Sequence, residues 1–183
     1  MKHVFVLCLP RSRTAWLTMF LNGAGVTAIH DGWQYAKSAK QLRRVMGAYE
    51  DEVAVNVDSA NILFYDEIRE EFPDAEFIKI IRNVKDVKKS LKKSYGKADY
   101  SSILRYAEAL KTVEAGITVD YDNWTEYTSS EIFRFVTGEV LLDLAWLTQA
   151  HDFKVTITKD KIRDDLRAAE YGLVGHIVNK LRG

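Results

Sequence analysis

The chain of 183 residues carries 26 basic and 26 acidic side chains, which give a formal net charge of zero, and 47% of its residues are hydrophobic. This composition excludes disordered and collagen-like chains and supports one domain over residues 1–183, and its neutrality argues against bulk binding of duplex nucleic acid. No apolar run is long enough to span a membrane, and the single cysteine, Cys8, fits a reducing compartment. We therefore expect a cytoplasmic protein with no membrane or nucleic-acid partner; its oligomeric state cannot be read from the sequence.

Apolar strands alternate with amphipathic helices along the chain. In chain order, the pattern predicts a strand at 3–9, a helix at 14–22, a strand at 26–29, a helix at 35–48, a strand at 53–57, a helix at 64–72, a strand at 76–81, a helix at 84–95 capped by Asn83, a helix at 100–115, a strand at 117–121, helices at 129–136 and 139–150, an edge strand at 153–158 and a helical C-terminus. Continuous apolar runs such as 3–9 are typical of strands buried on both faces of a parallel sheet. The alternation predicts an α/β fold of three layers, with helices on both faces of a central, mostly parallel sheet.

The charges are segregated along the chain although they sum to zero. Residues 50–76 hold ten acids and one base, whereas residues 79–97 hold eight bases and one acid. The first thirty residues contain Lys2, Arg11 and Arg13 and no acid. This distribution leaves room for one concentrated anion site.

The segment Leu9–Thr14 lies between the first predicted strand and the first predicted helix. Such a turn exposes backbone N–H groups at a helix N-terminus, where the helix dipole favours an anion. Arg11 and Arg13 add positive charge, and Ser12 and Thr14 add hydroxyl donors. The alternative is a polar loop with two solvated arginines. The segment is not a Walker A loop, because it lacks the two glycines and the lysine of that motif.

A second basic segment follows the predicted strand at 76–81. Arg82 leaves the end of this strand, and Ser90 lies two turns into the next helix, so both residues can converge on one phosphate at the carboxyl edge of the sheet. The lysines of that helix are better interpreted as a solvated face; they are Lys88, Lys89, Lys92 and Lys93.

Together the two segments resemble the phosphate-binding motifs of sulfotransferases that use 3′-phosphoadenosine 5′-phosphosulfate (PAPS), and in size the chain is similar to the small bacterial or viral-type members. The residues that match the first motif are Pro10, Arg11, Ser12, Thr14 and Leu17. Arg13 stands where that family has glycine, and Val84 stands where its second motif has proline. The spacing from Arg82 to Ser90 is the family's own, and Phe72–Ala75 and Val119–Trp124 resemble further family segments.

The resemblance implies a P-loop NTPase-like sulfotransferase fold and transfer of a sulfuryl group from PAPS to a hydroxyl or amine of a small-molecule or glycan acceptor, with no metal. It gives Arg11 the place of the catalytic cation at the leaving phosphate. The loop that holds the 5′-phosphosulfate would comprise Pro10, Arg11, Ser12, Arg13, Thr14 and Ala15. Arg82 and Ser90 would hold the 3′-phosphate, as they would in the product nucleotide, 3′,5′-ADP.

The general base has three candidates. Asp31 is preferred, followed by His30, because both end the second predicted strand near the place where small bacterial members of the family carry their base. Asp58, at the end of the strand at 53–57, is the third candidate. Its alternative role is to cap the helical segment that follows it.

Two other functions stay open. An apolar strand that ends in Asp58 also resembles the magnesium-binding Walker B strand of a nucleotide kinase or NTPase. The lysine-rich segment 79–97 could instead serve a non-catalytic module that binds phosphonucleotides or nucleic acid. In cytosolic members of the sulfotransferase family, a C-terminal segment closes over the nucleotide. Residues 180–183 resemble this segment only weakly, which implies a more open site or loss of activity.

Overall fold

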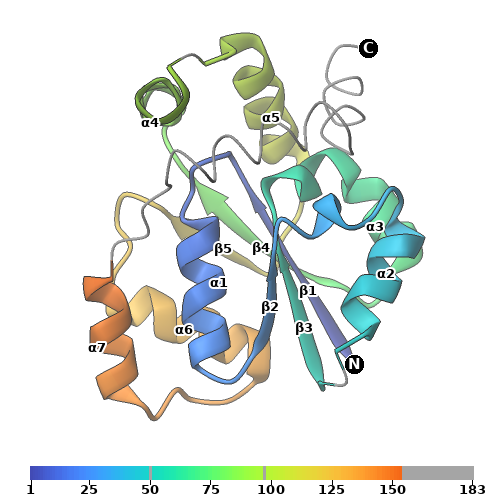
Figure 1. Cartoon of the computed structure of the whole chain (residues 1–183), viewed down its shortest axis with the longest axis vertical. Helices are drawn as coiled ribbons and strands as arrows, with labels where there is room; N and C mark the ends of the chain where they lie inside the picture. Colours follow the sequence, from blue (N-terminus) through green and yellow to red (C-terminus); the bar gives the residue numbers. More distant parts are fainter. Residues whose placement is uncertain (50, 97, 154–183) are drawn as a thin grey trace.

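The computed structural model describes residues 1–49, 51–96 and 98–153. Within these residues, five strands form one sheet in the order β2-β3-β1-β4-β5, and every neighbouring pair is parallel (Figure 1). The strands are β1 (Lys2–Cys8), β2 (Thr27–His30), β3 (Val53–Val57), β4 (Glu76–Ile81) and β5 (Ile117–Asp120). The expected parallel sheet is thus confirmed. Beyond Phe153, the strand expected at 153–158 and the expected C-terminal helix lie outside the described residues.

Seven α-helices and two short 3-10 helices connect and follow these strands in the part of the chain that is described. The helices are α1 (Thr14–Gly23), η1 (Gly32–Gln34), α2 (Ala39–Gly47), η2 (Ser59–Phe64), α3 (Tyr65–Glu71), α4 (Val84–Tyr95), α5 (Tyr100–Thr112), α6 (Glu126–Thr137) and α7 (Leu144–Asp152). The helix expected at 35–48 begins only at Ala39, because the Ser38 side chain accepts a hydrogen bond from the Gln41 N–H and caps the helix there. Asn83 caps α4 as predicted, by accepting a hydrogen bond from the Lys85 N–H.

Side chains alternate across β1, and this alternation builds a core on each face of the sheet. Val4, Val6 and Cys8 pack against α1, α6 and α7, whereas Phe5 and Leu7 pack against η2, α2, α3 and α5 on the other face. All five side chains are fully buried. The fold is therefore the predicted three-layer α/β/α arrangement.

The neighbouring strands β1 and β4 send the chain to opposite faces of the sheet. β1 leads into α1, whose Leu17 and Phe20 belong to the first core, while β4 leads into α4, whose Val87 belongs to the second. In open α/β sheets, ligands bind where adjacent strands diverge in this way, at their carboxyl ends. The two arginine-bearing loops flank this point.

Among the described residues, no helix combines the length and the apolar character that a membrane crossing requires.

Candidate functional site

The loop between β1 and α1 has an unusual backbone. Arg11 has φ 68° and Arg13 has φ 63°, and Asp31 after β2 has φ 52°; within the described ranges these are the non-glycine residues in the left-handed region. Each left-handed residue with a side chain costs about 1–2 kcal/mol. Backbone strain of this kind gathers at functional sites. Arg13, which stands at the family's glycine position, thus adopts a conformation that glycine favours.

The N-terminus of α1 is open to an anion. Arg13 precedes the helix and makes no side-chain cap, and the first turn carries no acid, whereas α2 and α4 are capped by Ser38 and Asn83. The Ser12 hydroxyl oxygen is fully buried at this point and has no hydrogen-bond partner. Unsatisfied buried polar groups are costly, so the hydroxyl, the helix N–H groups and the dipole together suit a phosphate or sulfate.

Arg82 joins this loop from the end of β4. One of its terminal nitrogens donates to the Arg11 carbonyl, and its Nε is buried without a partner. Arg11 Nε in turn donates to Ser90 Oγ on α4, at 3.2 Å. Arg11 therefore contacts both Arg82 and Ser90, so the structure places these three predicted residues in one cluster.

An aromatic ring lies between two of the arginines. The Arg82 guanidinium is 3.8 Å from the ring centre of Tyr121, and the Arg13 guanidinium is 5.5 Å from the same ring. Arg13 also lies 5.7 Å from the ring centres of both Trp16 and Trp124. Tyr121 thus links the two loops through cation–π contacts. The sequence did not predict this contact, although Tyr121 belongs to the segment Val119–Trp124 that resembles the family.

His30 and Asp31 form a chain of polar contacts that reaches the same loop. His30 Nε2 lies 3.1 Å from Thr14 Oγ1, and His30 Nδ1 lies 3.1 Å from Asp31 Oδ2. A carboxylate at Nδ1 fixes the tautomer of the imidazole. His30 therefore lies beside Thr14, the first residue of α1, and Asp31 contacts the far side of its ring.

Asp58, the third candidate, is a buried cap. One carboxylate oxygen accepts from the Ala60 N–H at 2.8 Å and the other accepts from the Trp33 N–H at 3.1 Å, so its capping role is confirmed. Burial, followed by the negative charge of Asp31, raises the pKa of Asp58 to about 6. In the described ranges, no group of three or more His, Cys, Asp or Glu side chains is arranged to hold a metal ion.

A family profile described as a sulfotransferase domain matches residues 3–156. The chain belongs to this sulfotransferase family. The matched range includes both arginine-bearing loops and all three base candidates. Among curated proteins, none matches the chain.

Solved structures similar to this sulfotransferase-family chain include kinases. A sugar kinase from Janibacter sp. HTCC2649 is 12% identical, with a TM-score of 0.54, over 75% of this chain and 96% of that chain. A shikimate kinase from Bacteroides thetaiotaomicron is 13% identical, with a TM-score of 0.50, over 75% of this chain and 99% of that chain. At these identities the likeness shows the fold alone, which is P-loop-like.

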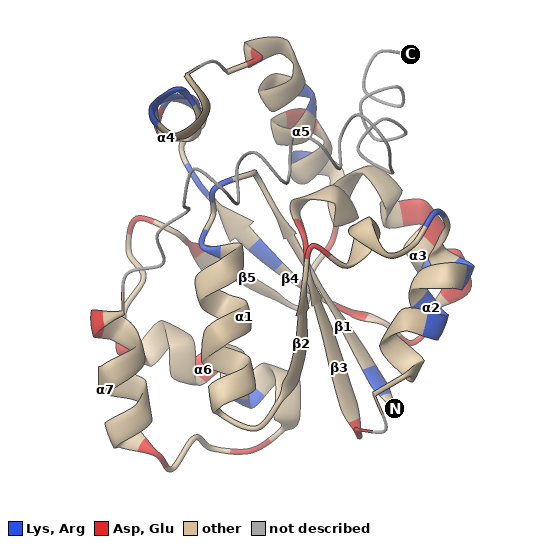
Figure 2. Ribbon diagram, viewed as in Figure 1, with Lys and Arg blue, Asp and Glu red and all other residues tan. Residues whose placement is uncertain are grey.

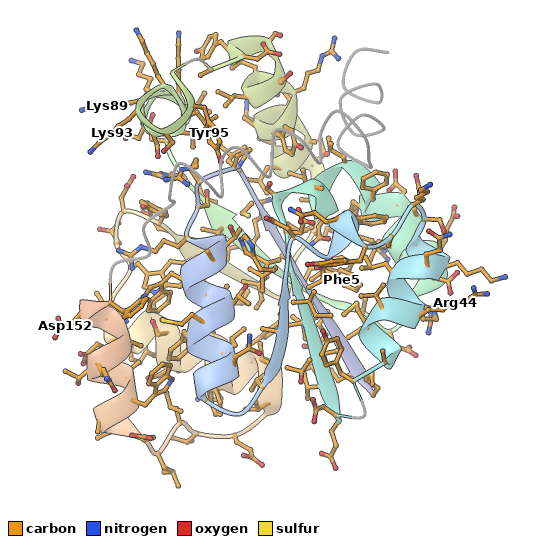
Figure 3. All side chains as sticks on the ribbon, in the orientation of Figure 1. Phe5, Arg44, Lys89, Lys93, Tyr95 and Asp152 are labelled. Atoms are coloured by element: carbon orange, nitrogen blue, oxygen red, sulfur yellow. The ribbon has the colours of Figure 1, made fainter. Side chains whose placement is uncertain are left out.

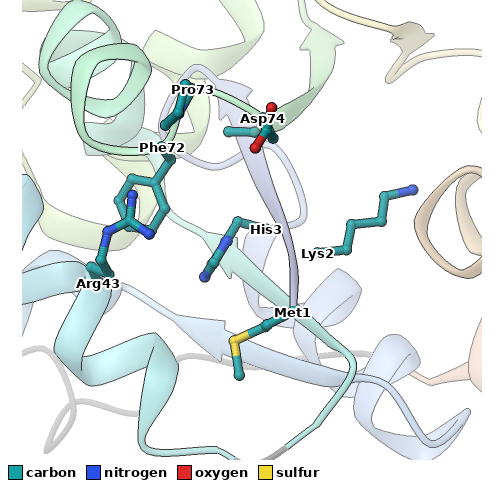
Figure 4. A pocket seen from close by; sticks show the side chains of 8 residues that line it. Met1, Lys2, His3, Arg43, Phe72, Pro73 and Asp74 are labelled. Carbon is teal, nitrogen blue, oxygen red and sulfur yellow. The ribbon is translucent and has the colours of Figure 1, made fainter.

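A cavity of about 320 Å³ lies at the opposite edge of the sheet, where β1 begins (Figure 4). Its lining comprises Met1, Lys2, His3, Arg43, Phe72, Pro73, Asp74 and Ala75. Its arginine is already paired, since Arg43 Nε lies 2.6 Å from Glu71 Oε1. No residue of the two arginine-bearing loops lines this cavity.

Proposed function

We propose that this protein transfers a sulfuryl group from PAPS to a hydroxyl or amine of a small-molecule or glycan acceptor. The observation that carries the proposal is the pair of buried polar atoms without partners, Ser12 Oγ and Arg82 Nε, on the loops that follow two neighbouring strands. A nucleotide with one anionic group at each end supplies acceptors for both atoms. Membership of the sulfotransferase family supports PAPS as this nucleotide.

When bound, PAPS supplies an activated sulfuryl group attached to a phosphate leaving group. The loop residues Pro10–Ala15 hold its 5′ end through the uncapped N–H groups of α1 and the Ser12 hydroxyl. Arg11 stabilises the negative charge that develops on the leaving phosphate, and Arg82 and Ser90 hold the 3′-phosphate. Catalysis of this kind is mainly positioning and charge stabilisation.

His30 is the base that the contacts favour. Its Nε2 faces the loop at Thr14, and Asp31 holds the proton on Nδ1, so that Nε2 can accept the proton of the acceptor. Asp31, the residue preferred from the sequence, acts through His30 in this arrangement. Asp58 has both oxygens engaged by backbone N–H groups and serves as a structural cap.

Thermal melting with two ligands tests the proposal. We expect 3′,5′-ADP to raise the melting temperature by about 5–10 °C at a hundredfold excess over its Kd, since this adds about 2.7 kcal/mol to a domain of this size. Arg82→Ala should abolish the shift, whereas the control Arg44→Ala, at an exposed position on α2, should keep it. Stabilisation by ATP with Mg²⁺ alone would instead indicate a kinase or NTPase. Binding with steep salt dependence and no preference for a 3′-phosphate would indicate a non-catalytic module.

A further inference from the structure

The exposed face of α4 carries a set of five lysines. These are Lys85, Lys88, Lys89, Lys92 and Lys93, all of them exposed. Figure 2 shows the blue of basic residues around α4. Lys88 lies 4.3 Å from the ring centre of Tyr100, and among the described residues none of the five lysines forms an ion pair with a carboxylate. Figure 3 shows Lys89 and Lys93 projecting away from the body of the protein.

Basic residues elsewhere in the fold are more often neutralised. Lys2 pairs with Glu76 at 3.0 Å and Lys111 pairs with Glu108 at 2.8 Å. Exposed acids such as Asp66 and Glu70 lie on a different helix, α3. The net charge of zero thus conceals a local excess of positive charge on one helix.

This helix borders the phosphate-binding site. α4 begins directly after Arg82 and Asn83, and its Ser90 accepts the hydrogen bond from Arg11. With a rise of about 1.5 Å per residue, the lysines at 89, 92 and 93 lie within about 5 Å of Ser90 along the helix axis. Because the Debye length is about 8 Å at physiological ionic strength and longer at low salt, exposed charges on this helix attract an anion that approaches the neighbouring site, most strongly at low salt.

We propose that the lysine face of α4 is an encounter surface that captures the anionic donor nucleotide and speeds its entry into the site, an inference that rests on the proposed function. Lysine suits this task because its ammonium is strongly hydrated and sits on a flexible stem, and it is less suited than arginine to fixed, forked contacts. A surface of this kind raises the association rate and has little effect on dissociation.

The test compares two triple variants of the full chain that remove the same charge. One variant carries Lys89→Gln, Lys92→Gln and Lys93→Gln, and the matched control carries Lys37→Gln, Lys40→Gln and Arg44→Gln, which are exposed positions on and before α2. Glutamine has nearly the helix propensity of lysine, so α4 should be retained. Stopped-flow tryptophan fluorescence reports the binding of 3′,5′-ADP, since Trp16 and Trp124 contact Arg13 of the loop.

We expect the α4 variant to associate about tenfold more slowly at low salt, with a dissociation rate within about twofold of the wild type and a smaller difference at high salt. The control should associate at the wild-type rate, and single and double α4 variants should give graded effects. Equal association rates in the two triple variants, or an effect confined to dissociation, would overturn this inference while leaving the proposed function in place. Failure of the wild type to bind 3′,5′-ADP would overturn the proposed function, and this inference with it.

Discussion

Replacing Tyr121 by leucine removes the ring that links the two arginine-bearing loops. The ring lies 3.8 Å from the Arg82 guanidinium and 5.5 Å from that of Arg13. A cation–π contact at a partly exposed site is worth about 0.5–1 kcal/mol and more when desolvated, so the loss of both contacts removes about 2 kcal/mol. For a chain of this size, we expect the melting temperature to fall by about 4–8 °C.

The same substitution should weaken the binding of 3′,5′-ADP by about tenfold, because Arg82 loses the surface that orients it. Calorimetry measures the affinity and scanning fluorimetry measures the melting temperature. Tyr121→Phe keeps the ring and should behave as the wild type in both assays. The reasoning is refuted if phenylalanine is as damaging as leucine, or if leucine changes neither quantity.

Substitutions at Asp58, Arg13, His30 and Asp31 test other parts of the account. Because burial raises the pKa of Asp58 to about 6, the folded protein keeps a proton between about pH 4 and pH 6 that the unfolded chain has lost. The free energy of unfolding should therefore fall by about 2–3 kcal/mol as the pH rises through this range. Urea unfolding at a series of pH values measures this slope, which Asp58→Asn should remove. Arg13→Gly removes the cation–π contacts of Arg13 but also relieves its left-handed strain, so its melting temperature should stay within about 3 °C of the wild type. Arg13→Ala removes the same contacts and keeps the strain, so its free energy of unfolding should fall by about 2 kcal/mol. Equal melting temperatures for the two variants would contradict this reasoning. His30→Ala should lower sulfuryl transfer about a hundredfold or more in an acceptor screen, and Asp31→Asn less, while both keep their affinity for 3′,5′-ADP; unchanged turnover in His30→Ala would remove His30 as the base.

Much of the fold follows from local sequence patterns. The strands at 53–57 and 76–81 have the bounds expected from their apolar runs, and Asn83 caps the next helix as predicted. The residues from 32 to 38 were harder to predict because tertiary contacts shape them. Trp33 donates its backbone N–H to Asp58 and its indole N–H to Asn61, which holds a 3-10 turn at Gly32–Gln34 that the sequence pattern did not predict. The helix predicted at 35–48 begins only at Ala39.

The proximity of the two arginine-bearing loops could be predicted because each lies at a strand end and strand ends meet at one edge of a parallel sheet. The contacts between them could not. Arg11 and Ser90 are 79 positions apart in sequence, and His30 is 16 positions from Thr14, so their pairing depends on how the helices pack on the sheet. Tyr121 lies beside Arg82 because β4 and β5 pair with Ile81 opposite Asp120 and the Tyr121 N–H donates to the Ile81 carbonyl. Its contact with Arg13, 108 positions away in sequence, depends on how the loop after β1 packs.

The most direct test of the account compares 3′,5′-ADP with its isomer 2′,5′-ADP by calorimetry, because the two carry the same charge and differ only in the position of one phosphate. The account predicts that the wild type binds 3′,5′-ADP about thirtyfold or more tightly, since a charge-assisted hydrogen bond to phosphate contributes about 1.5–3 kcal/mol. It also predicts that Arg82→Ala binds both isomers with equal, weak affinity. Equal affinity of the wild type for the two isomers would contradict the assignment of Arg82 and Ser90 to a 3′-phosphate, and with it the proposed sulfotransferase donor site.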